Sequence, residues 1–233
     1  VLGAITRGWT IRPGAATAEP AIRVARRRGR YSVSAGSRQD ACRPATAVGA
    51  ACSLVVDLVE ATADARPDML CLHAGAVRIG PAQEASGLVV FPSRRRAGKC
   101  TRIARLASRG AEVLADDVLP LAASHGSHAA RAFGVASRLR LPRPTTLPAE
   151  FHRWAADPAG PSEAWSRYIA PAPGRLAALG TAAPIKAFVF LDRGPDDAAA
   201  SLHKAGTGVA LEALLLQNFG VAASASEILD RLA

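Results

Sequence analysis

Two apolar segments near the middle of the chain constrain the fold most strongly. Residues 69–77 (Met-Leu-Cys-Leu-His-Ala-Gly-Ala-Val) and 87–92 (Gly-Leu-Val-Val-Phe-Pro) are nearly continuous apolar runs of strand length. Runs of this kind, without polar alternation, are typical of strands buried on both faces of a sheet. We therefore expect an α/β fold, with helices packed against a mixed sheet of the α+β kind.

Other segments supply the remaining helices and strands. Apolar residues recur at three- and four-residue steps from Val48 to Val59, which predicts a helix over 45–65. Further helices are expected from the residues after Ser93 to about Ser108, and over 208–219 and 225–232. Short strands are expected over 9–11, 31–33, 112–115 and 185–191, with an extended segment over 118–121. Residues 122–184 predict loops and short helices.

This pattern divides the chain into two parts. Residues 1–66 are expected to form N-terminal strands and a helix, as a small subdomain, and residues 67–233 the core. No stretch approaches the roughly 20 apolar residues of a membrane-spanning helix, and no signal peptide is visible. The four cysteines form no C-x-x-C pair, which favours a reduced, cytoplasmic protein over a disulfide or zinc framework.

The chain is strongly basic, and arginine accounts for almost all of the excess. Lys and Arg together number 29 against 19 acidic residues, a formal net charge of +10. Such a charge leaves nucleic-acid or phosphate binding open. However, no DNA-binding motif is present and aromatic residues make up only 5% of the chain, which disfavours a nucleic-acid partner.

A glycine-lysine pair follows the second apolar run and precedes a predicted helix. The eight residues 93–100 read S-R-R-R-A-G-K-C, against the phosphate-binding loop pattern G-x-x-x-x-G-K-[S/T]. Backbone amides and a helix N-terminus attract phosphate, and Lys99 would contact the β- and γ-phosphates. The candidate nucleotide-binding residues are Ser93, Arg94, Arg95, Arg96, Ala97, Gly98, Lys99, Cys100 and Thr101.

Acidic residues and a histidine lie at suitable places around this loop. Asp116 and Asp117 follow the next predicted strand, 17 residues after Lys99. A carboxylate at such a strand end can hold Mg²⁺ or accept a hydroxyl proton. His73 lies in the apolar run before the loop. Taken alone, the aspartates also suit a turn, and His73 suits a hydrogen-bonded core position.

The three motifs together resemble the C-terminal domain of HPr kinase/phosphorylase, and more closely the shorter bacterial HPr kinase-like proteins. The resemblance rests on His73–Val77, Ser93–Thr101 and Ala115–Val118 in this order and spacing. It implies a fold like that of the HPr kinase catalytic domain and PEP carboxykinase. It also implies ATP and Mg²⁺ as ligands, an unidentified protein or peptide phosphoacceptor, and homo-oligomers.

The resemblance also implies a role for each matching residue. Lys99 would contact the phosphates, and Asp116 would be the base toward the acceptor hydroxyl. Asp117 would lie beside the metal, with Cys100 at the position of the family's metal-binding serine. His73 would lie near the phosphates or the acidic pair. The chain is thus expected to be a serine kinase of the transferase class.

Three positions depart from the family pattern. Ser93 and Arg96 replace loop glycines, and Cys100 offers a thiol, which is a poor ligand for a hard cation. A second hypothesis is therefore a catalytically weak or inactive nucleotide-binding relative with a regulatory role. Weaker candidates for site residues are His125, His128, Trp154, Trp165, Tyr168 and Arg193.

Overall fold

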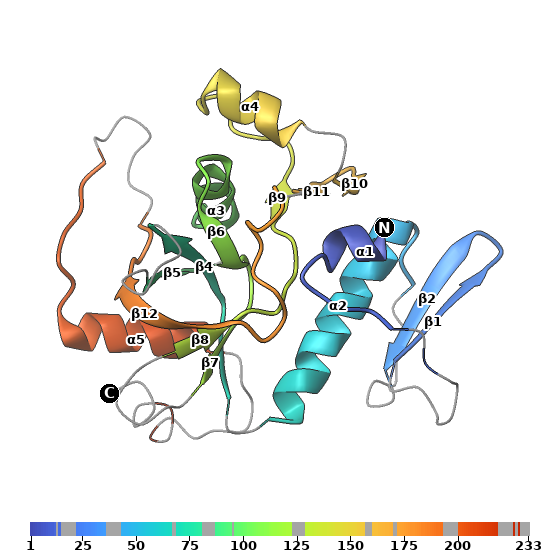
Figure 1. Ribbon diagram of the computed structural model, residues 1–233, viewed down its shortest axis with the longest axis horizontal. Helices are drawn as coiled ribbons and strands as arrows, with labels where there is room; N and C mark the ends of the chain where they lie inside the picture. Colours follow the sequence, from blue (N-terminus) through green and yellow to red (C-terminus); the bar gives the residue numbers. More distant parts are fainter. Residues whose placement is uncertain are drawn as a thin grey trace.

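The computed structural model describes residues 1–12, 14, 22–35, 43–66, 69–80, 87–94, 96–122, 129–156, 160–169, 172–192, 200–218, 226 and 228 (Figure 1). Among these, seven strands form one sheet in the order β3-β7-β8-β12-β5-β4-β6. The β12–β5 pair is parallel and the other pairs are antiparallel. The strands are β3 (Leu70–Leu72), β4 (Ala74–Ile79), β5 (Gly87–Pro92), β6 (Glu112–Ala115), β7 (Leu119–Ala122), β8 (Ala129–Arg131) and β12 (Ala182–Phe188). The mixed α/β class expected from the sequence is confirmed.

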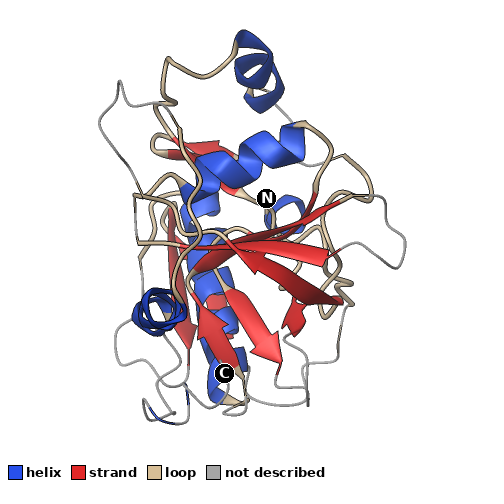
Figure 2. Ribbon diagram, turned by 90° about the vertical axis from the view of Figure 1, so that its left-hand side faces the viewer, coloured by secondary structure: helices blue, strands red, loops and turns tan. Residues whose placement is uncertain are grey.

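Helices cover both faces of this sheet, as Figure 2 shows. Along β5, Leu88 and Val90 pack in a cluster with Leu214 of helix α5 (Thr207–Gln217). Phe91 points to the opposite face and packs with Ile103 of helix α3 (Lys99–Ser108). Side chains alternate between the two faces of a strand, and both faces of β5 are covered by a helix. This is why β5 is apolar at every position. The prediction that residues 87–92 form a doubly buried strand is confirmed.

The other apolar run, residues 69–77, forms two strands and not the single strand expected. His73 interrupts it, because its amide donates to the Gln217 carbonyl at the end of α5, at 2.7 Å. Leu72 forms a bridge with Asn218 beside it, and the amide of Ala74 donates to the Asp117 carbonyl at 3.1 Å. The break therefore places His73 between the end of α5 and the acidic pair.

The N-terminal region holds α1 (Leu2–Ile5), the hairpin β1 (Ile22–Arg27) and β2 (Arg30–Ala35), and α2 (Ala47–Asp64). Thr46 caps α2, since its hydroxyl accepts from the Gly49 amide at 2.9 Å. The expected strand over 9–11 is wrong: this segment is irregular, and the Trp9 indole donates to the Phe133 carbonyl. Helices α1 and α2 share a core with Phe133, Ala136 and Tyr168. The division at residue 66 stays a prediction.

Residues 122–184 contain more strand than the sequence indicated. Besides β8 and the start of β12, they hold β9 (Arg138–Arg140), β10 (Ser162–Glu163) and β11 (Ser166–Tyr168), which form a small separate sheet. Where the structure describes this segment, it has one helix, α4 (Ala149–Ala155). Strands of two or three residues are too short to show a period of two, which is why the pattern predicted loops.

Two boundaries at the C-terminal end also differ. β12 begins at Ala182, three residues before the predicted 185–191, and the amide of Val189 still donates to Val90. The helix expected over 225–232 lies outside the described residues, apart from Ser226 and Ile228. No helix among the described residues is both long enough and apolar enough to cross a bilayer.

Candidate functional site

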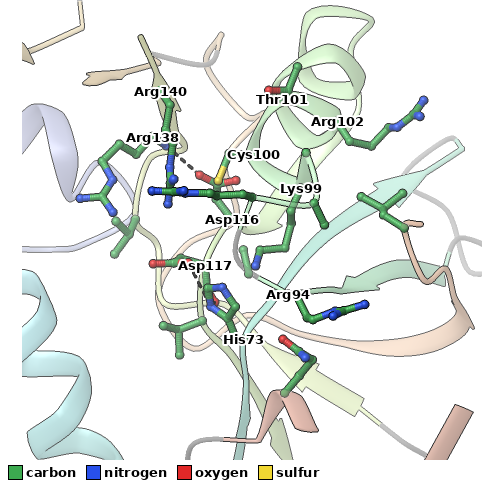
Figure 3. A pocket seen from close by; sticks show the side chains of 18 of the residues that line it. His73, Arg94, Lys99, Cys100, Thr101, Arg102, Asp116, Asp117, Arg138 and Arg140 are labelled. Atoms are coloured by element: carbon green, nitrogen blue, oxygen red, sulfur yellow. Dashed lines mark hydrogen bonds and ion pairs between the residues drawn. The ribbon is translucent and has the colours of Figure 1, made fainter. Parts of the chain in front are cut away.

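A cavity of about 1270 Å³ lies where the loop after β5, the start of α3 and the ends of β6 and β9 meet. Figure 3 shows it with the side chains that line it. It brings together most of the residues predicted from the sequence: His73, Arg94, Arg96, Ala97, Gly98, Lys99, Cys100, Thr101, Asp116 and Asp117. Ser93 lies just behind this lining, and Arg95 lies outside the described residues.

The loop delivers the start of α3 to the cavity. Gly98, the residue before the helix, has φ +93°, in the left-handed region that glycine tolerates best. Arg96 also has a left-handed φ of 71°. No side chain of the described residues caps the helix. Its first amides therefore have no acceptor within the helix and give this end partial positive charge, which suits an anion.

Lys99 occupies the first turn of α3 and is buried, with 4% of its surface exposed. Its Nζ donates to the Ser93 carbonyl at 3.3 Å. Burial lowers the pKa of Lys99, while Asp117, Cys100 and Asp116 oppose that shift. The Ser93 hydroxyl accepts from the Leu191 amide at 3.3 Å, so Ser93 ties the loop to the segment after β12.

A glycine in β4 sets how closely α3 approaches the sheet. A Cβ atom at Gly75 would lie 2.6 Å from Cγ1 of Ile103 and 3.3 Å from Cγ of Lys99. The first of these distances is shorter than real contacts allow, so a side chain at position 75 would force Ile103 of α3 to shift. The absence of a side chain at Gly75 thus allows α3, which carries Lys99, to pack closely against β4.

Asp116 follows β6 and is buried, with 7% of its surface exposed. Its Oδ2 accepts from the Arg138 amide at 2.8 Å, and its Oδ1 has no hydrogen-bond partner among the described residues. Burial, with help from Asp117, raises the pKa of Asp116 to about 6, against the hydrogen bond from the Arg138 amide, a hydrogen bond with the Cys100 thiol and the nearby Lys99. At neutral pH this carboxylate is ionised and ready to take a proton, as a general base must be.

Asp117 is the exposed member of the acidic pair. Its side chain is 55% exposed, and its Oδ1 lies 3.1 Å from Nδ1 of His73. The His73 side chain is 24% exposed and borders the cavity. In Figure 3 both side chains lie below Asp116, toward the Lys99 ammonium. His73 is therefore placed to orient Asp117.

Cys100 stands where the resemblance expects a metal-binding serine. Burial and the two aspartates raise the pKa of its thiol to about 12, so it stays protonated at neutral pH. A protonated thiol is a poor ligand for Mg²⁺. Thr101 does not replace it, since its side chain lies apart from the acidic pair in Figure 3. Among the described residues, no group of three or more His, Cys, Asp or Glu is placed to hold a metal ion.

Three lining residues beside the acidic pair were not predicted from the sequence as site residues: Cys52 of α2, and Arg138 and Arg140 of β9. Nη1 of Arg138 donates to Sγ of Cys52 at 2.9 Å. Burial raises the pKa of Tyr168, with its Cys52 neighbour as a further cause. The alternation Arg-Leu-Arg over 138–140 was the available signal, but it lies in the region expected to be loops.

Of the weaker candidates within the described residues, Tyr168 lines this cavity and Trp154 and Trp165 do not. Trp154 packs against Phe151, with ring centroids 5.8 Å apart, and Trp165 is exposed. His125, His128 and Arg193 lie outside the described residues.

Comparison of the chain with models of protein families, with curated proteins and with solved structures gave no match.

Proposed function

We propose that the protein is an ATP-dependent phosphotransferase of the HPr kinase-like kind, acting on a hydroxyl group of a protein or peptide. One observation carries this proposal. Asp116 is a buried carboxylate with a pKa near 6 whose Oδ1 has no hydrogen-bond partner among the described residues, and it lies in the same cavity as Lys99 and the start of α3. A base next to a phosphate-binding element is what phosphoryl transfer to a hydroxyl needs.

The phosphate side of the cavity is formed by the loop and α3. The free amides at the start of the helix would bind phosphoryl oxygens. Lys99 would exchange its hydrogen bond to the Ser93 carbonyl for one to the β- or γ-phosphate. The buried position of its ammonium strengthens that attraction, because the local dielectric constant is low.

The reaction itself moves one proton and one phosphoryl group. The acceptor hydroxyl gives its proton to Asp116, and its oxygen forms a bond to the γ-phosphorus. The bond between that phosphorus and the β–γ bridging oxygen breaks, and ADP leaves with the electron pair. The Arg138 amide on Oδ2 holds the carboxylate so that Oδ1 is the atom that takes the proton.

The acidic pair also suits the divalent cation that accompanies a triphosphate. Asp117, exposed and oriented by His73, is the residue most able to reach such an ion. One or two carboxylates together with phosphate oxygens are a common Mg²⁺ environment. When bound there, Mg²⁺ would neutralise charge on the phosphoryl oxygens. The predicted contribution of Cys100 stays a prediction, and its protonated thiol argues for a weak one.

A binding experiment tests the phosphate side. Titration calorimetry with ATP and Mg²⁺ should show binding to the natural protein and at least a tenfold loss of affinity in Lys99→Met. Lys204→Met is the matched control, because Lys204 is exposed and lies outside the cavity. Absence of ATP binding by the natural protein would overturn the proposal.

A second candidate, a nucleotide-binding protein with little or no turnover, is favoured by the Cys100 thiol and the left-handed Arg96. The rate of phosphoryl transfer distinguishes the two candidates, and where no acceptor is supplied the rate of ATP hydrolysis does so. If the second candidate is right, turnover is low and rises in the double variant Cys100→Ser, Arg96→Gly. Cys100→Ala is the control, since it removes the thiol without adding a hydroxyl ligand. Strong turnover by the natural protein excludes the second candidate.

A further inference from the structure

The wall of the cavity formed by β9 carries two arginines on one face. Arg138 and Arg140 both line the cavity, while Leu139 between them is buried with Phe151 and Ala155 of α4. Residues two apart on a strand share a face, so the two guanidinium groups are offered to the same space. This wall lies beside α3, because Leu139 packs with Ala104 of that helix, and Arg140 is near enough to help lower the pKa of Lys99.

Neither guanidinium forms an ion pair with a carboxylate of the described residues, although Asp117 is near enough to help raise the pKa of Arg138. Arg138 donates to the Cys52 thiol, a weak acceptor, at 2.9 Å. Arg140 forms no hydrogen bond or ion pair through its side chain with any residue that the structure describes. Guanidinium groups bind carboxylates through two parallel hydrogen bonds, and a partly desolvated one is a strong anion site.

The net charge of the cavity lining also favours binding of an anion. Its described lining carries seven basic side chains against four acidic ones: Arg94, Arg96, Lys99, Arg102, Arg105, Arg138 and Arg140 against Glu60, Asp116, Asp117 and Asp192. A triphosphate on the phosphate side would be matched by the loop and α3. The β9 wall would remain cationic and available to a second anion.

This second anion would lie beside the proposed base. The amide of Arg138 donates to Asp116 Oδ2 at 2.8 Å, so the Arg138 side chain leaves the backbone next to that carboxylate. The guanidinium of Arg138 is near enough to Asp117 and Cys100 for both to help raise its pKa, so a group that it binds would lie near the acidic pair. The Asp116 carboxylate itself repels an anion, which is why the arginines are needed on this side.

We propose that the phosphoacceptor carries a carboxylate close to the reacting hydroxyl, and that Arg138 and Arg140 bind this carboxylate. The inference rests on the proposed function, because it takes Asp116 as the base toward the acceptor. A hydroxy acid and a serine flanked by acidic side chains both present this chemistry. The two sources are separated by the probes below.

The test uses the full chain with Mg²⁺ and a non-hydrolysable ATP analogue, in two matched pairs of probes. One pair is glycerate and glycerol; the other is the blocked peptides Glu-Ser-Glu and Gln-Ser-Gln. The charged member of one pair should bind at least tenfold more tightly than its neutral partner, and that pair identifies the source. The preference should disappear in the double variant Arg138→Gln, Arg140→Gln and persist in Arg131→Gln, an exposed arginine of β8 outside the cavity.

Each result then has one meaning. Equal binding of the two members, no binding of any of the four probes, or a preference that survives in the double variant overturns the inference. If the double variant does not fold, Arg140→Gln alone decides, because Arg140 is exposed and should lower the preference severalfold. Failure of the ATP analogue to bind, with the arginine-dependent preference intact, overturns the proposed function and leaves the anion site standing.

Discussion

The backbone amide of Arg138 donates a hydrogen bond of 2.8 Å to Oδ2 of Asp116, and this bond joins two strands that are far apart in the chain. β6 ends at the acidic pair, and β9 begins at Arg138. The bond satisfies one oxygen of a buried carboxylate and leaves Oδ1 without a partner among the described residues. Asp116 is thus held in place while part of its hydrogen-bonding capacity stays unused.

Asp116→Asn should make the protein more stable at neutral pH while stopping turnover. Burial raises the pKa of Asp116 from 3.8 to about 6, so the folded state holds this proton more tightly than the unfolded chain. The stability that this protonation contributes is complete below pH 3.8 and is lost as pH rises through about 6. At pH 7.5 the ionised group costs about 3 kcal/mol, which asparagine avoids while still accepting from the Arg138 amide.

Thermal unfolding at pH 7.5 and at pH 4 checks this expectation. The midpoint should rise in Asp116→Asn at pH 7.5 and change little at pH 4. Asp117→Asn serves as control, because the Asp117 side chain is 55% exposed and should leave the midpoint nearly unchanged. A lower midpoint for Asp116→Asn at pH 7.5 would contradict the argument.

The pH dependence of activity should follow the same carboxyl group. A general base works in its ionised form, so kcat/KM should fall as pH drops through about 6, by about tenfold per pH unit below it. Between about pH 7 and 9 the Cys100 thiol adds no change, since its pKa is raised to about 12. Carbon NMR of the Asp116 carboxyl group gives the midpoint independently of turnover. A midpoint near 4 by NMR would show that burial does not shift this group.

Arg96→Gly should stabilise the protein by about 1 kcal/mol, because a non-glycine residue with left-handed φ is strained. The φ of Arg96 is 71°, and Arg28 in the β1–β2 turn has φ 49°. Arg28→Gly should therefore give a similar gain away from the cavity. Arg96→Ala, which removes the charge and keeps the strain, should give none. Chemical denaturation of the three variants measures these differences, and an equal gain in Arg96→Ala would show that charge and not backbone strain is responsible.

Gly75→Ala should weaken both folding and ATP binding. The added methyl group would lie 2.6 Å from Ile103 and force α3 away from β4. Overpacking of this kind costs about 1–3 kcal/mol. The displaced helix carries Lys99, so ATP affinity should fall as well. Gly208→Ala in α5 is the control, because nothing lies within 4 Å of its added Cβ and alanine favours helix. Chemical denaturation measures the stability of both variants, and titration calorimetry measures their ATP affinity. Unchanged ATP affinity in Gly75→Ala would show that packing at Gly75 does not affect the phosphate side.

The elements with strong periodicity were predictable, and those built from distant partners were not. β5 is a continuous apolar run and α2 has apolar residues at helical spacing, and both elements appear as expected. The break at His73 depends on the carbonyl of Gln217, which no local pattern around residue 73 reveals. The short strands β8 to β11 exist because of what they pair with, not because of their own sequence.

The same distinction applies to the candidate site. The loop, Lys99 and the acidic pair were predicted because their chemistry follows a known order along the chain. Arg138 and Arg140 enter the cavity through the pairing of β9 with β11, which is invisible in the sequence. The short period Arg-Leu-Arg indicated that the two side chains share a face, but not which space they face.

The hydrogen bond from the main chain of Arg138 has a consequence for how this protein can diversify. Every amino acid except proline supplies the same amide to Asp116, whatever side chain it carries. Substitutions at Arg138 and Arg140 can therefore alter the proposed anion site while the main-chain hydrogen bond to Asp116 remains. The side chains of β9 can therefore vary while its main chain keeps the same hydrogen bond to Asp116.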